Sequence, residues 1–182
     1  MLSDGVVELR PMQRRDFDSI KRAARDPEIR RRFGLLKESP TEYFERYRKL
    51  ERDERGGAFA VSDVGGECLG LVSFESRDAG RVELGYWLLP EGRGRGRATR
   101  ALWLLSRWAL DQPGVERVEL STSPENAVSQ HVAERCGFRR EGTLRSYHVV
   151  DGRREDAVIF SLLAGDLDSV SPEVPPSESV KH

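Results

Sequence analysis

Cysteine is scarce in this chain of 182 residues, and the usual signals for metal binding and membrane insertion are missing. Cys68 and Cys136 are the only cysteines, and neither has a partner at the spacing of metal ligands. Residues 1–10 carry Asp4 and Glu8 and lack the apolar core of a secretory signal. No apolar run approaches the roughly 18 residues that a membrane-spanning helix needs. We therefore expect a cytoplasmic protein with reduced thiols, no metal site and no membrane contact.

The overall charge gives no sign of a nucleic-acid partner. Thirty basic and 31 acidic residues leave a net charge of −1, so we expect no direct binding of nucleic acid. Residues 92–110 depart from this balance, because they contain five arginines and no acid. Such a local excess of positive charge indicates a local role.

The length suits a single domain, because a chain of this size buries about 70% of its unfolded surface in one core. We expect that domain to span residues 1–168. Residues 169–182 place Pro172, Pro175 and Pro176 among serines, a composition typical of a disordered tail.

Hydrophobic periodicity predicts alternating strands and helices. Strands are expected at residues 6–9, 58–62, 68–74, 81–89, 115–122, 138–150 and 154–163. Helices are expected at residues 16–24, from Pro27 after an Asp26 cap, from Ser39 to a stop at Gly56-Gly57, and at 98–109 and 124–136. Hairpin turns at Gly65-Gly66 and Asp151-Gly152 make most neighbours antiparallel. The strand–helix–strand order over residues 81–122 predicts one parallel pair. This is an α+β fold, with a mixed, largely antiparallel sheet flanked by helices.

The most distinctive segment is the glycine-arginine turn, residues 90–99, which joins a predicted strand directly to a predicted helix. Glycines allow a backbone to approach a ligand closely, because no Cβ intervenes. The N-terminus of the following helix offers unpaired N–H groups and the positive end of its dipole. Arginines add positive charge where phosphates would lie. The turn therefore predicts a phosphate-binding site.

Three other interpretations of this turn are possible. RNA-binding arginine-glycine tracts occur as disordered repeats, whereas this segment is single and continues into an amphipathic helix. A P-loop requires a Gly-Lys-Ser/Thr sequence, and the turn contains no lysine. A dinucleotide-binding fold would use Gly94 and Gly96 with Glu116 or Glu119 as its acid. It is disfavoured because Thr99 takes the place of the third glycine and antiparallel hairpins flank the segment.

Several motifs in order resemble the GNAT superfamily of N-acetyltransferases. Arg93-x-x-Gly96-x-Ala98 is similar to the pyrophosphate loop of that superfamily. The segments at 83–87, 126–138, 141–142 and 151–156 resemble the branch of RimJ/RimL-like ribosomal-protein alanine acetyltransferases. The resemblance is strong over residues 82–163 and weak at Leu9-Arg10-Pro11 and Asp16. It implies a single-domain acyl-CoA N-acyltransferase fold, in which two parallel central strands, here 81–89 and 115–122, splay apart around coenzyme A.

The same resemblance implies how acetyl-CoA is bound. Backbone groups near Leu88 and Leu89 would bind the pantetheine arm and face the thioester carbonyl. The pyrophosphate would be held at the turn, chiefly through main-chain N–H groups. The residues of the turn assigned to the coenzyme are Arg93, Gly94, Arg95, Gly96, Arg97, Ala98 and Thr99. Asn126 could bind the coenzyme or brace the strand ends, and equally could be an ordinary residue at a helix N-terminus.

The chemistry needs a proton for the departing thiolate. Many family members use a tyrosine seven residues after the asparagine, but here that position is Ala133. Ser129 lies where the RimJ/RimL-like branch has a serine, and it is the best local hydroxyl for this role and for contact with the coenzyme. A packing or surface role for Ser129 remains the alternative.

Two residues are candidates for the base that accepts a proton from the amine. Glu83 lies on the strand beside the expected acceptor groove, and some family members use a carboxylate there. His148 lies where the chain returns towards the site and has an unperturbed pKa near 6.5. Either residue could instead be an ordinary strand residue. His131 and His182 receive no role. Tyr86, Trp87 and Tyr147 are expected chiefly to pack, although one of them could border the acceptor.

We therefore expect an N-acetyltransferase that uses acetyl-CoA and acts on a primary amine, either a protein or peptide N-terminus or a small amine such as an antibiotic. Deprotonation at pH 7 costs about 1 kcal/mol for an α-amine and about 4.6 kcal/mol for lysine, which favours an acceptor of low pKa. Residues 10–55 hold 15 basic and 10 acidic residues, which hints at an acidic or phosphate-rich acceptor surface or simply at a solvated face. The chain could be a monomer or a homodimer. The alternative function is a non-catalytic acyl-CoA sensor.

Overall fold

A computed structural model describes residues 1–33, 38–63, 65–150 and 152–167. The expected disordered tail, residues 169–182, and Asp151 of the predicted hairpin turn lie outside the described residues. The strands are β1 Leu2–Ser3, β2 Glu8–Pro11, β3 Gly56–Ser62, β4 Cys68–Ser76, β5 Arg81–Leu88, β6 Arg117–Thr122, β7 Arg139–Val150 and β8 Arg153–Leu162. The α-helices are α1 Phe17–Ala23, α2 Pro27–Phe33, α3 Pro40–Arg52, α4 Arg97–Leu110, α5 Ala127–Arg135 and α6 Ala164–Leu167. The 3₁₀ turns are η1 Arg14–Asp16 and η2 Pro90–Gly92.

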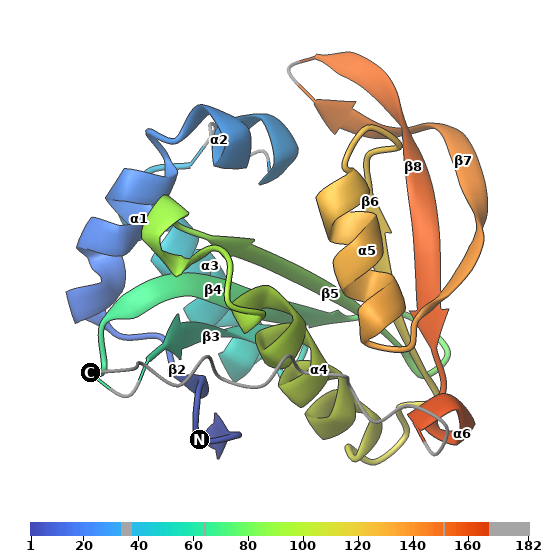
Figure 1. Cartoon of the computed structure of the whole chain (residues 1–182), viewed down its shortest axis with the longest axis horizontal. Coiled ribbons are helices and arrows are strands. Elements are labelled where there is room, and N and C mark those ends of the chain that lie inside the picture. The colour runs from blue at the N-terminus through green and yellow to red at the C-terminus, as the bar shows by residue number, and fades with distance from the viewer. Residues whose placement is uncertain (34–37, 64, 151, 168–182) are drawn as a thin grey trace, which may run out of the picture.

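The described strands form one mixed sheet in the order β1-β2-β3-β4-β5-β6-β8-β7. Neighbouring strands are antiparallel except for β5 and β6, which are parallel as predicted. The parallel pairing covers Arg81, Val82 and Glu83 of β5, opposite residues 117–119 of β6. Beyond this point the two strands diverge, and β6 continues beside β8 (Figure 1). The predicted splayed pair at the centre of the sheet is therefore confirmed.

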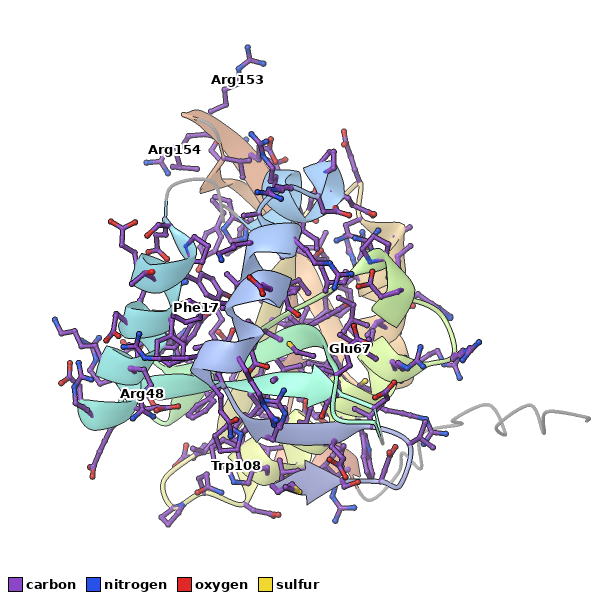
Figure 2. The ribbon with its side chains drawn as sticks, turned by 90° about the vertical axis from the view of Figure 1, so that its left-hand side faces the viewer. Phe17, Arg48, Glu67, Trp108, Arg153 and Arg154 are labelled. Carbon is purple, nitrogen blue, oxygen red and sulfur yellow. The ribbon has the colours of Figure 1, made fainter. Side chains whose placement is uncertain are left out.

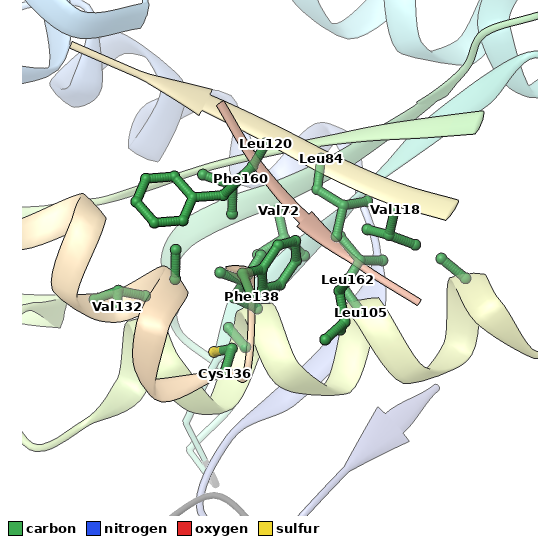
Figure 3. Close-up of a cluster of buried hydrophobic side chains, with 14 of the residues drawn as sticks. Val72, Leu84, Leu105, Val118, Leu120, Val132, Cys136, Phe138, Phe160 and Leu162 are labelled. Atoms are coloured by element: carbon green, nitrogen blue, oxygen red, sulfur yellow. The ribbon is translucent and has the colours of Figure 1, made fainter. Parts of the chain in front are cut away.

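Helices cover both faces of the sheet. On one face, α4 and α5 pack against the apolar side chains of the strands, including Leu102 and Leu105 from α4 and Val132 from α5 (Figure 3). On the other face, α1, α2 and α3 contribute Ile20, Ile29 and the aromatic residues of α3 to a second cluster. β5 supplies both clusters, since Val82, Leu84 and Leu88 belong to the first and Trp87 to the second.

Side-chain caps determine where the helices near the site begin. Asp26 accepts hydrogen bonds from the N–H groups of Glu28 and Ile29, so the predicted cap of α2 is confirmed. Ser39 and Glu42 form a capping box at the start of α3. Asn126 accepts a hydrogen bond from the Ser129 N–H at the start of α5. Gly137 follows α5 with a φ of 85°, the conformation that favours glycine after a helix.

The start of the chain and the end of α3 differ from the prediction. The strand β2, which pairs with β3, begins at Glu8 rather than at Val6 and includes Pro11 as its last residue. α3 ends at Arg52, and Gly56 belongs to β3 instead of terminating the helix. A Cβ on Gly56 would lie 2.4 Å from the Phe74 carbonyl oxygen. Glycine is needed there because β3 and β4 approach closely, a reason that local sequence does not reveal.

Among the described helices, none is both long enough and apolar enough to cross a lipid bilayer.

Candidate active site

The site lies where β5 and β6 part. The glycine-arginine turn follows β5 through η2, and a loop of four residues joins β6 to α5. Two cavities open at this fork. The first lies between the turn and α5, and the second lies between the two strands and the β7–β8 hairpin. We refer to them as the turn cavity and the hairpin cavity.

The backbone of the turn is shaped to receive an anion. Gly94, Arg95 and Gly96 have successive positive φ values of 74°, 53° and 69°. This arrangement leaves five amide N–H groups that donate to no other group in the part of the chain that the structure describes, those of Gly94, Arg95, Gly96, Ala98 and Thr99. Successive N–H groups in such a turn, together with the positive end of α4, form an anion-binding concavity.

Arg93 is bonded to other parts of the chain through both its main chain and its guanidinium. Its N–H donates to the Pro90 carbonyl, 3.1 Å away, so its main chain is not offered to a ligand. Its guanidinium donates to Glu28 at 2.6 Å, to Asp26 at 3.3 Å and to the Leu88 carbonyl at 3.1 Å. Arg93 thus ties the turn to the first residues of α2 and to the end of β5. The pKa of Asp26 is lower than its ordinary value. Burial acts against this shift, whereas the hydrogen bond from the Ile29 N–H and the nearby charge of Arg93 produce it.

The other four arginines of residues 92–110 divide into two groups. Arg100 pairs with Asp4 at 2.6 Å, and Arg107 lies over the Trp103 ring at 5.0 Å. Arg95 and Arg97 have no carboxylate within ion-pair distance among the described residues. The positive charge left without an acidic partner is therefore concentrated at the turn itself.

The turn cavity has a volume of about 280 Å³. It brings together most of the predicted coenzyme-binding residues, namely Leu88, Arg93, Gly94, Gly96, Arg97, Ala98, Thr99, Asn126 and Ser129. Leu89 and Arg95 do not line it. Leu89 is buried, its N–H donates to the Leu69 carbonyl at 2.9 Å and its own carbonyl accepts from Gly92, so its main chain is already engaged.

Sequence reasoning missed the contribution of α5 to this cavity. Val128, His131, Val132 and Arg135 line it along one side of the helix. His131, which received no role from the sequence, is exposed on the surface of α5 and lines the turn cavity. The spacing of Val128, His131 and Arg135, one helical turn apart, was the available signal.

The hairpin cavity has a volume of about 370 Å³ and is acidic. Among the described residues, its lining includes four carboxylates and no lysine or arginine; the carboxylates belong to Glu83, Glu125, Glu155 and Asp156. His148 is its one histidine. The described residues of the segment 10–55, whose basic excess hinted at an acidic acceptor or simply at a solvated face, do not line this cavity.

Both predicted base candidates face the hairpin cavity. The Glu83 carboxylate accepts two hydrogen bonds from Arg77, at 2.6 and 3.0 Å, and one from the Ser121 hydroxyl at 3.3 Å. His148 lies opposite Glu155 in the β7–β8 pairing, and its ring packs edge-on against Tyr147. A proton accepted by Glu83 would weaken its ion pair with Arg77, whereas the described residues impose no such cost on His148.

The two cavities share three residues: Tyr86, Asn126 and Ser129. Asn126 and Ser129 are buried, and the Asn126 side chain is used as the cap of α5. The Tyr86 hydroxyl donates to the Ser129 oxygen at 3.1 Å. Tyr86, for which the sequence favoured packing and left a place beside the acceptor open, lies at the junction. Its neighbour Trp87 does pack, and its ring N–H donates to the buried Tyr43 hydroxyl.

The residues present fit coenzyme A. Five amide donors and two unpaired arginines suit a diphosphate, and the cavity beside them is lined by apolar groups of β5 and α5 that suit a pantetheine arm. The shared residues place a hydroxyl pair between this cavity and an acidic one that suits an amine. No group of three or more histidine, cysteine or acidic side chains able to hold a metal occurs among the described residues.

Comparison with known proteins identifies relatives of the whole domain. The family model described as "Acetyltransferase (GNAT) domain" matches residues 7–139. YdaF of Bacillus subtilis is 34% identical over 100 residues, which are 54% of this chain and 55% of YdaF. The spermidine N(1)-acetyltransferase of Escherichia coli K12 is 27% identical over 161 residues, 87% of this chain and 86% of that protein. The structure of Mycobacterium smegmatis RimJ in complex with CoA-disulfide superposes with a TM-score of 0.79 at 27% identity, over 90% of this chain and 84% of RimJ.

Proposed function

Because the chain belongs to the acetyltransferase (GNAT) family and is an acyl-CoA-dependent N-acetyltransferase, we propose that the turn cavity binds acetyl-CoA and that the hairpin cavity receives a cationic amine. The observation that carries this assignment is the set of five uncommitted N–H groups from Gly94 to Thr99. They would hold the diphosphate, with the side chains of Arg95 and Arg97 nearby. The predicted coenzyme role is kept for this loop. The main-chain N–H groups of Arg93 and Leu89 take no part in it, because they already donate to carbonyl groups of the chain.

The hairpin cavity supports a class of acceptor. In the part of the lining that the structure describes, four carboxylates and no basic side chain other than His148 favour a ligand with positive charge. An amine arrives mainly as its ammonium form, and a second positive charge on the acceptor would be held by the remaining carboxylates. A polyamine, or a protein N-terminus followed by basic residues, meets this requirement. Both types agree with the similarity to a spermidine acetyltransferase and to the RimJ/RimL-like branch.

The transfer proceeds by direct attack of the neutral amine on the thioester carbonyl. Backbone N–H groups of β5 near Leu88 would stabilise the negative charge on the carbonyl oxygen. His148 would accept the proton that the ammonium loses before attack, since the carboxylate of Glu83 is held by Arg77. Ser129 would give a proton to the departing thiolate, because it is buried and lines both cavities. The side chain of Asn126 holds the start of α5, and with it Ser129, in place.

Two measurements test the proposal. Calorimetry with acetyl-CoA is expected to show one binding site per chain, with an affinity that falls as salt rises because charged groups hold the phosphates. A thiol-release assay over a panel of polyamines, peptides with free N-termini and amine antibiotics is expected to show the highest kcat/KM for di- and polycationic amines. Binding of acetyl-CoA without release of thiol from any amine would favour a non-catalytic sensor. Salt-sensitive retention of RNA that acetyl-CoA does not displace would instead favour the RNA-binding interpretation.

A further inference from the structure

Tyr86 and Ser129 form a hydroxyl pair that connects the two cavities. The Tyr86 hydroxyl donates to the Ser129 oxygen at 3.1 Å, although the residues lie 43 positions apart on β5 and α5. Tyr86 is the one tyrosine that lines either cavity within the described part of the chain, and it lines both. The bond crosses the gap between a strand and a helix at the junction where donor and acceptor would meet.

Neighbouring positions on α5 offer no other hydroxyl for this role. Ala133 is completely buried on the same helix and carries no group able to transfer a proton. The amide of Asn126 is used to cap α5. A phenol supplied from the strand therefore stands beside Ser129 where the helix supplies none.

We propose that Tyr86 is a catalytic residue that passes the amine proton to the departing thiolate through Ser129. This inference rests on the proposed function. The attacking nitrogen forms its bond to the carbonyl carbon and carries one proton too many, while the carbon–sulfur bond breaks and leaves a thiolate. Tyr86 accepts the proton from nitrogen as it gives its own proton to Ser129, and Ser129 gives its proton to sulfur. Both hydroxyls end as they began, and the products are the amide and the free thiol.

This route is consistent with the surroundings of the pair. The hydroxyls exchange protons with each other, so neither side chain has to remain charged in a partly buried place. The two hydroxyl oxygens lie 3.1 Å apart, which is within the distance over which a proton passes along a hydrogen bond. His148 acts earlier, on the ammonium form of the acceptor, and the relay acts during breakdown of the thioester.

A double-mutant cycle tests the relay. Tyr86→Phe and Ser129→Ala are each expected to lower kcat about 100-fold, as general acid–base catalysis does, while the Kd of acetyl-CoA stays within twofold of the original. The two changes together are expected to lower kcat no further than either alone, because both interrupt one path. Tyr147→Phe removes the same atom from an exposed tyrosine of β7 that lines neither cavity, and it serves as the matched control.

A proton inventory, which measures kcat in mixtures of H₂O and D₂O, distinguishes a catalytic role of Tyr86 from a merely structural one. The unchanged enzyme is expected to show a curved dependence of kcat on deuterium content, because two or more protons move together, and Tyr86→Phe is expected to make the dependence linear. The relay is overturned if Tyr86→Phe retains full kcat. It is also overturned if kcat of the double variant falls by the product of the two factors measured for the single variants. Absence of acetyl transfer by the unchanged enzyme would overturn the proposed function together with the relay.

Discussion

Glu155 is the carboxylate whose contribution to acceptor binding can be tested most cleanly. It lies on β8 opposite His148, lines the hairpin cavity and is exposed. Glu155→Gln is expected to raise the KM of a dicationic amine about 2- to 5-fold at low salt, the range of a single exposed charge interaction. Steady-state kinetics over a range of salt concentrations measures the effect, which should shrink as salt screens the charge.

Glu67→Gln is the matched control, since Glu67 is an exposed acid in the turn before β4 and lies away from the Arg153 and Arg154 tip of the hairpin (Figure 2). An equal effect of both changes would show that net charge, and not the hairpin cavity, attracts the acceptor.

Cys136 makes the stability of the protein depend on pH in the alkaline range. The thiol is buried after α5 and donates to the Thr99 carbonyl, and burial raises its pKa to about 12. In the unfolded chain the pKa of a cysteine is about 8.5. The unfolded state therefore loses this proton first. The contribution of the neutral thiol is fully present below pH 8.5 and is lost as pH rises towards 12.

This effect predicts a slope of about 1.4 kcal/mol per pH unit in the free energy of unfolding between these limits. Urea denaturation at pH 7, 9 and 10 measures it. Cys136→Ala is expected to be less stable at pH 7, because a cavity replaces the sulfur, but to lose less stability than the original protein between pH 9 and pH 10. Parallel losses in both proteins would contradict the assignment of this thiol.

At the scale of elements, the glycine-arginine turn depends on its left-handed backbone. Gly96 caps α4 with a φ of 69°. Gly96→Val is expected to cost about 1–2 kcal/mol in stability, because an L-residue is strained there, and to weaken acetyl-CoA binding at least tenfold by rotating the N–H groups. Thermal unfolding and calorimetry measure the two effects separately.

Gly114 allows a matched comparison in the loop between α4 and β6. Its φ is 78°, and no atom lies within 4 Å of the Cβ that a substitution would add. Gly114→Val is expected to destabilise the chain by a similar amount while leaving the Kd of acetyl-CoA unchanged. Equal losses of affinity in the two variants would mean that strain alone, rather than the geometry of the turn, accounts for the result.

The elements were largely predictable, and the partners of their side chains were not. Periodicity and turn residues predicted α4, the parallel β5–β6 pair and the glycine-arginine turn that joins β5 to α4, because these features depend on residues close together in sequence. Arg93 was assigned to the coenzyme because the sequence places it in the motif. The motif gave no sign of the Asp26 and Glu28 carboxylates that its guanidinium contacts, because they lie more than 60 residues earlier.

Tyr86 illustrates the same limit. On a strand of alternating apolar residues, a tyrosine resembles any other packing group. Only the approach of α5 to β5, a tertiary contact, places Ser129 within reach of its hydroxyl. The acidic lining of the hairpin cavity was missed for a related reason, because β5, the loop before α5 and β8 supply its carboxylates from distant parts of the chain.

At the scale of the whole molecule, the divergence of two parallel strands organises the site. One helical layer packs on each face of the sheet, and the apolar clusters on both faces hold β5 in place. The fork between β5 and β6 then opens towards the turn on one side and towards the β7–β8 hairpin on the other (Figure 1). Donor and acceptor would approach from different cavities and meet at three shared residues, which explains how one small domain can bring two substrates together.

A crystal structure of the protein with acetyl-CoA tests the central claim most directly. We predict diphosphate oxygens within about 3.2 Å of the N–H groups between Gly94 and Thr99, and the acetyl group beside Tyr86 and Ser129. A complex in which those N–H groups contact only water while the coenzyme lies elsewhere would contradict the account.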